Sequence, residues 1–517
     1  MRYPGTYCAT QPDKTAVVID RSAGADRTTY AQLEERSIRL ANTLRERGLR
    51  RGDVVAVLSE NHIGYLEVYW AAIRSGLYMT PINRHLASDE IGYQLNNSGA
   101  SALVASHLFA DVAAAALAAA PRVTVRLMWD GRGDRFDAYE DALRAASPEQ
   151  TGPMPWGRVM VYSSGTTGRP KGIKHPLTDT DLTSPDATGM GSLEQALLRM
   201  GDTSVYLCPA PLYHAAGLFW SAGIHELGGT LVIMERFDPE RFLAVIERER
   251  VTHTQVVPTM LVRILKLDRE VRDRYDLSSL ESLVHAAAPC PEEVKRAMIG
   301  WLGPIVDEYY AGTEGSGLTF IGSRDWLAHP GSVGKPVTGI PRICDELGNL
   351  LPARTPGLIY FEQPVAPFEY HGDAEQTRAS RHPAHPGWTT LGDVGYLDED
   401  GYLYLTDRQN FMIISGGVNI YPAEIENVLV MHDKVLDVAV FGLPDPEMGQ
   451  FVQAVVQVMP GVEPGAELAE ELRTYARGKL AGYKVPAHID FRDELPRLAT
   501  GKMAKRVLRD EFLAAMP

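Results

Sequence analysis

Several features that define whole classes of protein are scarce or missing in this chain. It holds only four cysteines, Cys8, Cys208, Cys290 and Cys344, and no CxxC pair, so the spacing of zinc sites and disulfide-stapled domains is absent. Its N-terminus, residues 1–6, lacks the apolar core of a signal peptide, and no run of about 18 apolar residues occurs. We therefore expect a cytoplasmic protein with reduced thiols and no transmembrane segment. Peripheral contact with a membrane is not excluded if the substrate is hydrophobic.

Positively charged residues are also fewer than negatively charged ones. Lys and Arg number 51 against 66 Asp and Glu, which gives a formal net charge of −15. This balance argues against non-specific nucleic-acid binding, although a local basic site for an anionic ligand is not excluded. The hydrophobic fraction of 45% is ordinary for a globular protein, and 517 residues predict two or more domains. The oligomeric state is left open between a monomer and a homodimer.

Helical and strand patterns alternate along the first half of the chain. Apolar residues recur at near-helical spacing from Thr29 to Leu49, and Asp53–Ser59 follows as a continuous apolar strand pattern. The alternation continues with helices at Tyr65–Gly76 and Ala110–Ala120 and strands at Ser101–Ala105, Thr203–Leu207, Leu231–Met234 and Val251–Val257. It predicts an α/β fold of stacked, mostly parallel sheets with helices. Between these elements, the polar segment Thr178–Gly201 is expected to be a mobile loop.

The second half of the chain has a different character. Gly348–Gln363 offers short extended runs, such as Gly357–Glu362, and predicts a small β-rich unit. From Arg408 to Pro517 the pattern is that of a separate α+β module of normal domain size. We therefore predict a large domain at residues 1–407 and a small, mobile α+β domain at residues 408–517.

The strongest chemical signal runs from Val161 to Gly172, VYSSGTTGRPKG. An apolar strand end leads into hydroxyl residues and glycines, whose backbone can bend so that consecutive N–H groups face an anion. Lys171 adds a positive charge. The segment is not a Walker motif, because Gly172 follows the lysine where Ser or Thr is required. It predicts a cradle for phosphates.

This segment resembles the phosphate-loop signature of the adenylate-forming superfamily, which contains acyl-CoA synthetases, peptide-synthetase adenylation domains and beetle luciferases. Further motifs of that family follow in the expected order over nearly the whole chain. The resemblance implies that phosphates of ATP or AMP are bound by Ser163, Ser164, Gly165, Thr166, Thr167, Gly168 and Lys171.

The resemblance places the rest of the nucleotide along two motifs. In Val284–Cys290 the alanines Ala286, Ala287 and Ala288 would lie along the adenine. In Asp307–Gly315, DEYYAGTEG, Tyr310 would stack on the base, Thr313 would bond the α-phosphate and Glu314 would hold Mg²⁺, a cation that prefers oxygen ligands. Ala311 stands where the family usually has Gly.

Two later motifs complete the nucleotide site in the same way. Asp393, which ends Trp388–Asp393, would accept hydrogen bonds from both ribose hydroxyls, for which a carboxylate has the capacity. Arg408 resembles the family arginine near the ribose and phosphate.

The acyl pocket is assigned by resemblance to Pro209–Gly217, PAPLYHAAG, and to the residues directly after this motif. Its expected walls are His214, Leu218, Phe219, Ala286 and the turn at Gly315, Ser316 and Gly317. Their small side chains suggest room for a bulky or long acyl chain, with the segment Thr178–Gly201 near the entrance.

The C-terminal motifs imply a moving domain. Asn410 stands at the family's hinge, where Asp or Lys is usual, and Asn tolerates uncommon backbone angles. Gly416 and Gly417 would line the pantetheine channel, and Lys502 matches the catalytic lysine. Lys484 lies in another motif of the family, without an assigned role.

Together the motifs predict an ATP-dependent acyl-CoA synthetase that uses Mg²⁺. A fatty or other hydrophobic carboxylic acid would react with ATP to give acyl-AMP and pyrophosphate, and the acyl group would then pass to CoA. Catalysis is assigned to Lys502, Thr313, Glu314 and Arg408. The alternatives are an enzyme that loads a carrier protein, a luciferase-like oxygenase and a catalytically degenerate nucleotide-binding homologue, although retention of the charged motif residues argues against the last.

Overall fold

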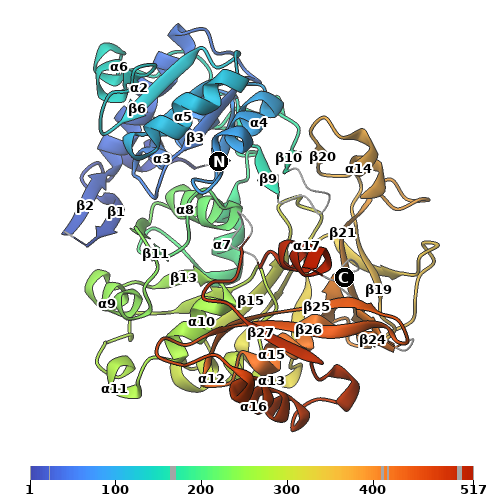
Figure 1. Cartoon of the computed structure of the whole chain (residues 1–517). Helices are drawn as coiled ribbons and strands as arrows, with labels where there is room; N and C mark the ends of the chain where they lie inside the picture. The colour runs from blue at the N-terminus through green and yellow to red at the C-terminus, as the bar shows by residue number, and fades with distance from the viewer. Residues whose placement is uncertain are drawn as a thin grey trace. The chain divides into compact units, whose positions relative to one another are not determined.

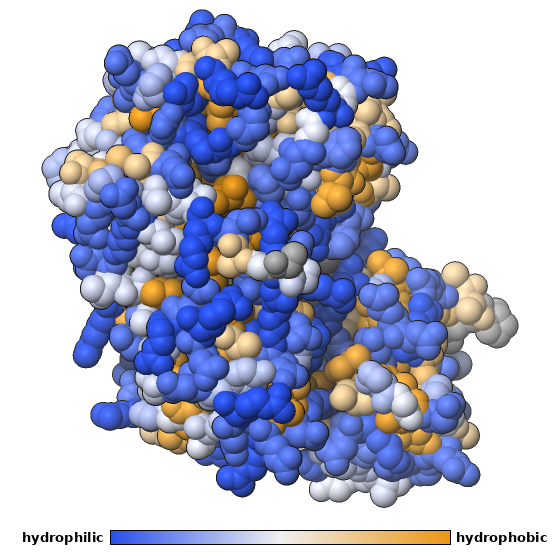
Figure 2. All heavy atoms as spheres, turned by 90° about the vertical axis from the view of Figure 1, so that its left-hand side faces the viewer, coloured by the Kyte–Doolittle hydropathy of each residue, from blue (hydrophilic) through white to orange (hydrophobic). Residues whose placement is uncertain are grey.

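The computed structural model describes residues 2–22, 24–163, 170–408, 413–415, 418–497 and 503–515 (Figure 1). Two compact units are present. The first comprises Met1–Val256, Leu267–Val284 and Pro367–Thr377, and the second comprises Val257–Lys266, His285–Ala366 and Arg378–Pro517. Among the described residues, no helix is long and apolar enough to cross a membrane. Hydrophilic residues cover most of the face drawn in Figure 2, with apolar residues in scattered patches.

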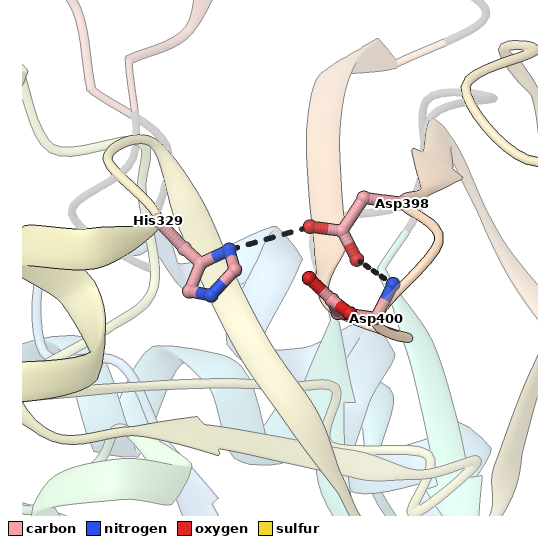
Figure 3. Close-up of side chains that lie close together, drawn as sticks. All are labelled: His329, Asp398 and Asp400. Atoms are coloured by element: carbon pink, nitrogen blue, oxygen red, sulfur yellow. Dashed lines mark hydrogen bonds and ion pairs between the residues drawn. The ribbon is translucent and has the colours of Figure 1, made fainter.

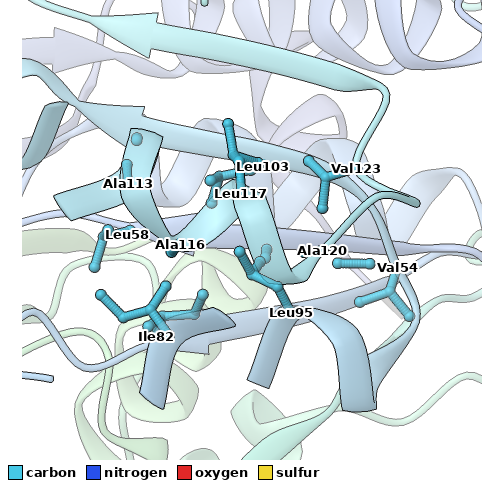
Figure 4. Packing of buried hydrophobic residues seen from close by; sticks show 14 of the residues in the cluster. Val54, Leu58, Ile82, Leu95, Leu103, Ala113, Ala116, Leu117, Ala120 and Val123 are labelled. Atoms are coloured by element: carbon cyan, nitrogen blue, oxygen red, sulfur yellow. The ribbon is translucent and has the colours of Figure 1, made fainter. Parts of the chain in front are cut away.

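The first unit contains a six-stranded sheet in which every recorded pair is parallel. Its order is β7-β6-β5-β3-β4-β8, with bounds β3 Val54–Leu58, β4 Tyr78–Ile82, β5 Ala100–Ser106, β6 Val125–Trp129, β7 Asp137–Ala138 and β8 Arg158–Val159. The accompanying helices are α2 Tyr30–Glu46, α3 Gly64–Arg74, α4 Ser88–Ser98, α5 Ala110–Ala116 and α6 Tyr139–Ala145. All five residues of β3 are buried, as expected for a parallel strand covered on both faces. Figure 4 shows the core on one face, where Val54 and Leu58 pack with residues of α4 and α5.

The predicted first helix and strands are confirmed to within a few residues. Helix α2 begins after Thr29, whose hydroxyl accepts the Gln32 N–H at 3.2 Å while the Gln32 side chain accepts the Thr29 N–H at 2.9 Å. This reciprocal capping box satisfies donors that the first turn of a helix otherwise leaves unpaired. The Ala110–Ala120 segment is helical as predicted, with a tighter final turn at Leu117–Ala119.

A second group of strands in the first unit is accompanied by three helices. The strands are β1 Thr15–Arg21, β2 Gly24–Thr29, β11 Val205–Cys208, β12 Thr230–Met234 and β13 His253–Val256. The helices are α7 Met190–Leu198, α8 Ala215–Leu227 and α9 Pro239–Glu249. The expectation that Thr178–Gly201 is a loop is therefore wrong over α7, which packs against α8 and buries Glu194 between them.

The part of the second unit before residue 409 is built mainly on antiparallel strands. They are β15 Val306–Ala311, β16 Leu318–Ile321, β17 Ser332–Thr338, β18 Ile340–Cys344, β19 Gly357–Glu362, β21 Trp388–Leu397 and β22 Leu403–Arg408, accompanied by α10 Pro258–Leu265, α12 Glu292–Leu302 and α13 Ser323–Ala328. Strand β19 has the predicted bounds and pairs with β18 and β21. The β-rich character predicted for this part of the chain is confirmed.

The C-terminal part of the second unit has its own α+β elements. They are β23 Ile413–Ser415, β24 Val418–Ile420, α15 Pro422–Leu429, β25 Val435–Asp445, β26 Gly449–Val458, α16 Ala466–Arg477, β27 His488–Phe491 and α17 Lys505–Ala515. One core cluster has all its buried members between Ile413 and Ile489. The boundary at residue 408 stays a prediction.

Candidate active site

The predicted phosphate segment of the first unit lies between two paired strands. β9, Val161–Ser163, and β10, Lys171–Lys174, run antiparallel, with Ser163 opposite Lys171. The strand end before the segment and the strand start after it therefore lie side by side at one end of a small sheet. Ser164, Gly165, Thr166, Thr167 and Gly168 lie outside the described residues, and only the backbone of Ser163 is described.

Lys171 is held in place by a strand nearly 200 residues further along. β20, Glu369–Tyr370, pairs with β10, with Tyr370 opposite Ile173. The Lys171 ammonium lies 5.6 Å from the centroid of the Tyr370 ring, within the range of a cation–π contact. The ring can therefore orient the lysine at the end of the segment.

The predicted acyl motif forms a tight turn into α8. His214 is the N-cap residue of this helix, is partly exposed, and has its ring centroid 4.4 Å from that of Tyr213. A Cβ added at Gly217 would lie 2.6 Å from the carbonyl oxygen of Pro211, so the turn needs glycine there. Phe219 is partly exposed, whereas Leu218 is fully buried.

In the second unit, β15 and β21 bring two predicted nucleotide residues into direct contact. The Tyr310 hydroxyl donates a hydrogen bond of 2.6 Å to Oδ2 of Asp393, and the Tyr310 ring packs against Phe361 with centroids 6.1 Å apart. Asp393 is opposite Arg408 in the β21–β22 register. Three residues from distant motifs are thus gathered, Tyr310 and Asp393 by a direct hydrogen bond and Asp393 and Arg408 by pairing of β21 with β22, although nothing is described of the Arg408 side chain.

The turn after β15 carries Thr313 and Glu314, both half-buried. Gly315 has φ of +70° and donates its N–H to the Gly312 carbonyl at 3.0 Å, which closes the turn. Gln363 donates to the carbonyls of Gly315 and Ser316 at 2.9 and 2.6 Å. This glutamine, which the motifs do not single out, fixes the backbone beside the two predicted catalytic side chains.

The Glu314 carboxylate suits a hard cation in its chemistry. Its Oε2 folds back to the side of Gly312 that also faces Leu391, since a Cβ added at Gly312 would lie 3.0 Å from Oε2 and 2.5 Å from Leu391. Leu391 is two residues before Asp393, so the carboxylate lies close to β21. Carboxylate oxygens of this kind fit Mg²⁺.

The predicted adenine segment leaves β14, Ser282–His285, with an uncommon backbone angle. Ala287 has φ of +76°, a conformation that costs a non-glycine residue free energy and often occurs at functional sites. Ala286 is buried, whereas Ala287 and Ala288 are exposed. The two exposed alanines therefore present a shallow surface of backbone and methyl groups.

A buried charged cluster beneath this segment is not evident from the motifs. Lys295 on α12 is fully buried, with its ammonium 2.6 Å from Oε2 of Glu308 on β15. Nε2 of His285 lies 3.6 Å from the same oxygen. Burial, and then the charge of Lys295, hold the pKa of His285 well below its usual value, so this imidazole is neutral. The one available sequence signal is that Lys295 falls among the buried positions Val294, Met298 and Ile299 of an amphipathic helix.

The remaining residues singled out from the sequence lie in the C-terminal part of the chain, and only one of them is described. Asn410, Gly416, Gly417 and Lys502 lie outside the described residues. Lys484, which has no role assigned from sequence, forms an ion pair of 2.6 Å with Glu424.

Comparison with known proteins covers almost all of the chain. A family model described as AMP-binding enzyme matches residues 6–368, and one described as AMP-binding enzyme C-terminal domain matches residues 424–502. A feruloyl-CoA synthase from an Amycolatopsis species is 35% identical, over 99% of this chain and 98% of its own. The fatty acid–[acyl-carrier-protein] ligase ScoC of Streptomyces coeruleorubidus is 32% identical, over 94% and 91%.

Solved structures of related proteins also match this chain over almost its whole length. ATP-bound MatB from Rhodopseudomonas palustris matches with a TM-score of 0.80 and 29% identity, covering 99% of both chains. The chain therefore belongs to the AMP-binding enzymes, the adenylate-forming superfamily that its motifs resemble, and is an AMP-forming acid–thiol ligase.

Proposed function

We propose that this ligase activates a hydrophobic carboxylic acid with ATP and transfers the acyl group to coenzyme A. The observation that carries the proposal is the arrangement around β21. Tyr310 bonds to Asp393, which is opposite Arg408 in the strand register. Base stacking, ribose binding and phosphate binding are the roles expected of these three residues, so their proximity supports one nucleotide site.

In the first half-reaction the substrate carboxylate attacks the α-phosphorus of ATP, and the bond to pyrophosphate breaks. Negative charge on the phosphate oxygens is stabilised by donors of the 163–171 segment, by the Thr313 hydroxyl and by Lys502, largely through position and electrostatics. Glu314 would hold Mg²⁺, which supplies further positive charge to the phosphates. Asp393 and Tyr310 orient the nucleoside.

In the second half-reaction the thiol sulfur of CoA attacks the acyl carbon, the bond between that carbon and the AMP oxygen breaks, and the thiol proton passes to solvent. Lys502 must leave the site before the thiol enters. Rotation of residues 408–517 about Asn410 would remove it and bring Gly416 and Gly417 to the site, a recognised type of gating movement.

In the first unit, the acid would lie against α8. His214 and Phe219 are partly exposed and can touch the substrate, whereas the buried Leu218 backs them from the core. The relative named as a feruloyl-CoA synthase supports an aromatic acid, and the relative named as a fatty-acid ligase supports an aliphatic one.

The acceptor has a second candidate, the thiol of a carrier protein. It is favoured by one observation, the 32% identity to an acyl-carrier-protein ligase over 94% of this chain. The same acyl-adenylate would serve either acceptor, so the two functions differ only in the second half-reaction.

The test is pyrophosphate release across a panel of short, medium and long fatty acids, aromatic acids and sterol-derived acids, with CoA, with a carrier protein, and with neither. Multiple turnovers with CoA and one class of acid, giving the acyl-CoA, are the expected result. Release that stops near one turnover with CoA but continues with the carrier protein would establish the second candidate. No release with any acid, together with no ATP binding by calorimetry, would overturn the proposal.

A residue-level test uses Lys502→Ala with Lys479→Ala as its control. Loss of one positioned charge at a developing negative centre costs about 10²- to 10³-fold in turnover. We expect that loss in acid-dependent pyrophosphate release for Lys502→Ala alone. Lys479 pairs with Glu293 on the surface and has no assigned part in the chemistry. Equal rates in the two variants would remove Lys502 from the mechanism.

A further inference from the structure

The turn between β21 and β22 holds a carboxylate in a fixed orientation. Asp398 is buried, and its Oδ1 accepts the N–H groups of Asp400 at 3.0 Å and Tyr402 at 2.8 Å. Its other oxygen, Oδ2, points toward His329, as Figure 3 shows. Backbone donors of this kind orient a carboxylate in the way that supporting hydrogen bonds orient metal ligands.

His329 reaches the same point from the end of α13, 69 residues earlier in the chain. Its ring stacks on Tyr402, with centroids 3.7 Å apart and an interplanar angle of 22°, so the plane of the imidazole is set by packing. Nδ1 of His329 lies 3.4 Å from Oδ2 of Asp398. This separation exceeds the upper range of about 3.2 Å for an N–H···O hydrogen bond.

The separation fits two ligands of one ion. Tetrahedral coordination with metal–ligand bonds of about 2.0–2.1 Å holds two ligand atoms about 3.3–3.4 Å apart. Asp400 supplies a third donor, since one ligand atom from each of the three residues lies within 4.8 Å of the others. Asp400 is exposed, so its carboxylate can rotate the remaining distance, and Figure 3 shows it on the same side of the turn as His329 and Asp398.

We propose that His329, Asp398 and Asp400 bind one divalent transition-metal ion, with Zn²⁺ as the best fit. An imidazole with two carboxylates suits Zn²⁺, whereas Mg²⁺ prefers oxygen ligands alone. Two cations lie nearby. The exposed Lys335 has its ammonium 4.4 Å from the centroid of the Tyr402 ring, and Arg354, which pairs with Glu399, interacts electrostatically with Asp398. With Glu399 counted, three carboxylates face these two cations.

Such an ion would join the β21–β22 turn to the end of α13. It is separate from the Mg²⁺ predicted at Glu314 and takes no part in the two half-reactions. Because the three ligands meet only in the folded chain, the ion stabilises the folded state by mass action. The same hairpin carries Asp393 and Arg408, so the ion would brace the strands that present the predicted nucleotide residues.

The experiment is a calorimetric titration of Zn²⁺ into the chelator-treated full chain, in excess Mg²⁺ and without nucleotide. The variants are His329→Gln and Asp400→Asn, the second being a near-isosteric change at an exposed residue. His432→Gln is the matched control. His432, like His329, lies 3.4 Å from a carboxylate, that of Glu471. The other charged group at this carboxylate is the cation Lys434, whereas the proposed site has a second carboxylate.

We expect one Zn²⁺ per chain, a loss of affinity of at least about tenfold in both site variants, and no change in the control. Thermal unfolding should show a Zn²⁺-dependent rise in Tm for the wild-type chain and the control alone. The proposal is overturned if the wild-type chain binds no Zn²⁺. It is equally overturned if the site variants bind as tightly as the wild-type chain, or if the control loses as much affinity as they do.

Discussion

Two glutamates are buried in different parts of the molecule with opposite kinds of neighbour. Glu308, on β15 of the second unit, has the ammonium of Lys295 at 2.6 Å. Glu226, on α8 of the first unit, lies near a second carboxylate, Glu194 on α7. Both oxygens of Glu194 are buried and make no hydrogen bond to any described residue, whereas Glu226 accepts the Gly191 N–H at 2.9 Å.

The difference shows that a partner, more than burial, decides the charge of a buried acid. Burial raises the pKa of Glu226 to about 8, and burial together with the Glu226 charge raises that of Glu194 well above its usual value. Burial also raises the pKa of Glu308, but the charge and hydrogen bond of Lys295 oppose the rise. We infer that Glu194 and Glu226 are largely protonated, whereas Glu308 is ionised in a pair with Lys295.

The largest expected effect comes from removing the cation. Lys295→Met would leave Glu308 buried and unpaired, which typically costs about 3–5 kcal/mol. Urea denaturation should show this as a lower free energy of unfolding. Since Glu308 and Tyr310 lie on the same face of β15, we also expect a higher KM for ATP.

The control for this prediction removes both charges. Lys295→Met combined with Glu308→Leu should recover most of the lost stability, because a buried ion pair replaced by apolar groups is often neutral or stabilising. A loss below about 1 kcal/mol in the single variant, or an equal loss in the double variant, would show that Lys295 does not hold Glu308 as an ion pair.

Sequence patterns predicted the helices and strands better than they predicted the contacts of the buried charged residues. The helix from Thr29 and the strand Gly357–Glu362 follow from local periodicity and turn residues, and both are present. α7 was missed because the polar residues, Gly and Pro that precede it suggest a loop. The helix itself contains LEQALL, residues 193–198, a run of strong helix formers that local sequence does offer, and it packs against α8.

In the candidate site, too, sequence motifs predicted some residues and missed others. Motif order brought Tyr310, Asp393 and Arg408 into one predicted site, but the pairs Tyr310–Asp393 and Asp393–Arg408 are 83 and 15 residues apart in the chain and depend on how the strands are arranged. Lys295 and Glu194 were missed because charged residues on helices are rarely fully buried. Gln363 was missed because its partners are backbone carbonyls, which leave no pattern in the sequence.

An effect that is smaller per pH unit is expected from pH in the first unit. The pKa of Glu226 is higher in the folded protein, at about 8, than in an unfolded chain, at the usual 4.5. The folded state therefore binds the proton more tightly, and its contribution to stability is complete below about pH 4.5 and lost as pH rises toward 8. Between these values the free energy of unfolding should fall by up to about 1.4 kcal/mol per pH unit for each such group.

Glu226→Gln tests this dependence, since the amide oxygen can still accept the Gly191 N–H while no proton is gained or lost. Urea titrations at pH 6, 7 and 8 should give a shallower slope of stability against pH for this variant, and a shallower one still with Glu194→Gln added. Glu34→Gln is the comparison at a carboxylate that already has a cation, Arg74, at 2.5 Å. A wild-type slope that persists in the double variant would mean that the acid pair is ionised throughout.

The smallest expected effect is that of replacing His285, the second group close to the Glu308 carboxylate. His285 is as deeply buried as Lys295 and lies 3.6 Å from the same carboxylate oxygen, so either residue could be taken for its partner. Both of its ring nitrogens are without a hydrogen bond to any described residue, and its lowered pKa keeps it neutral. A neutral ring with no hydrogen bond adds little, because its polar atoms are desolvated without compensation. His285→Leu should therefore change the free energy of unfolding by less than about 1 kcal/mol in either direction. A loss as large as that of Lys295→Met would instead identify the imidazole as the group that balances Glu308, and the cation would no longer explain how the second unit differs from the first.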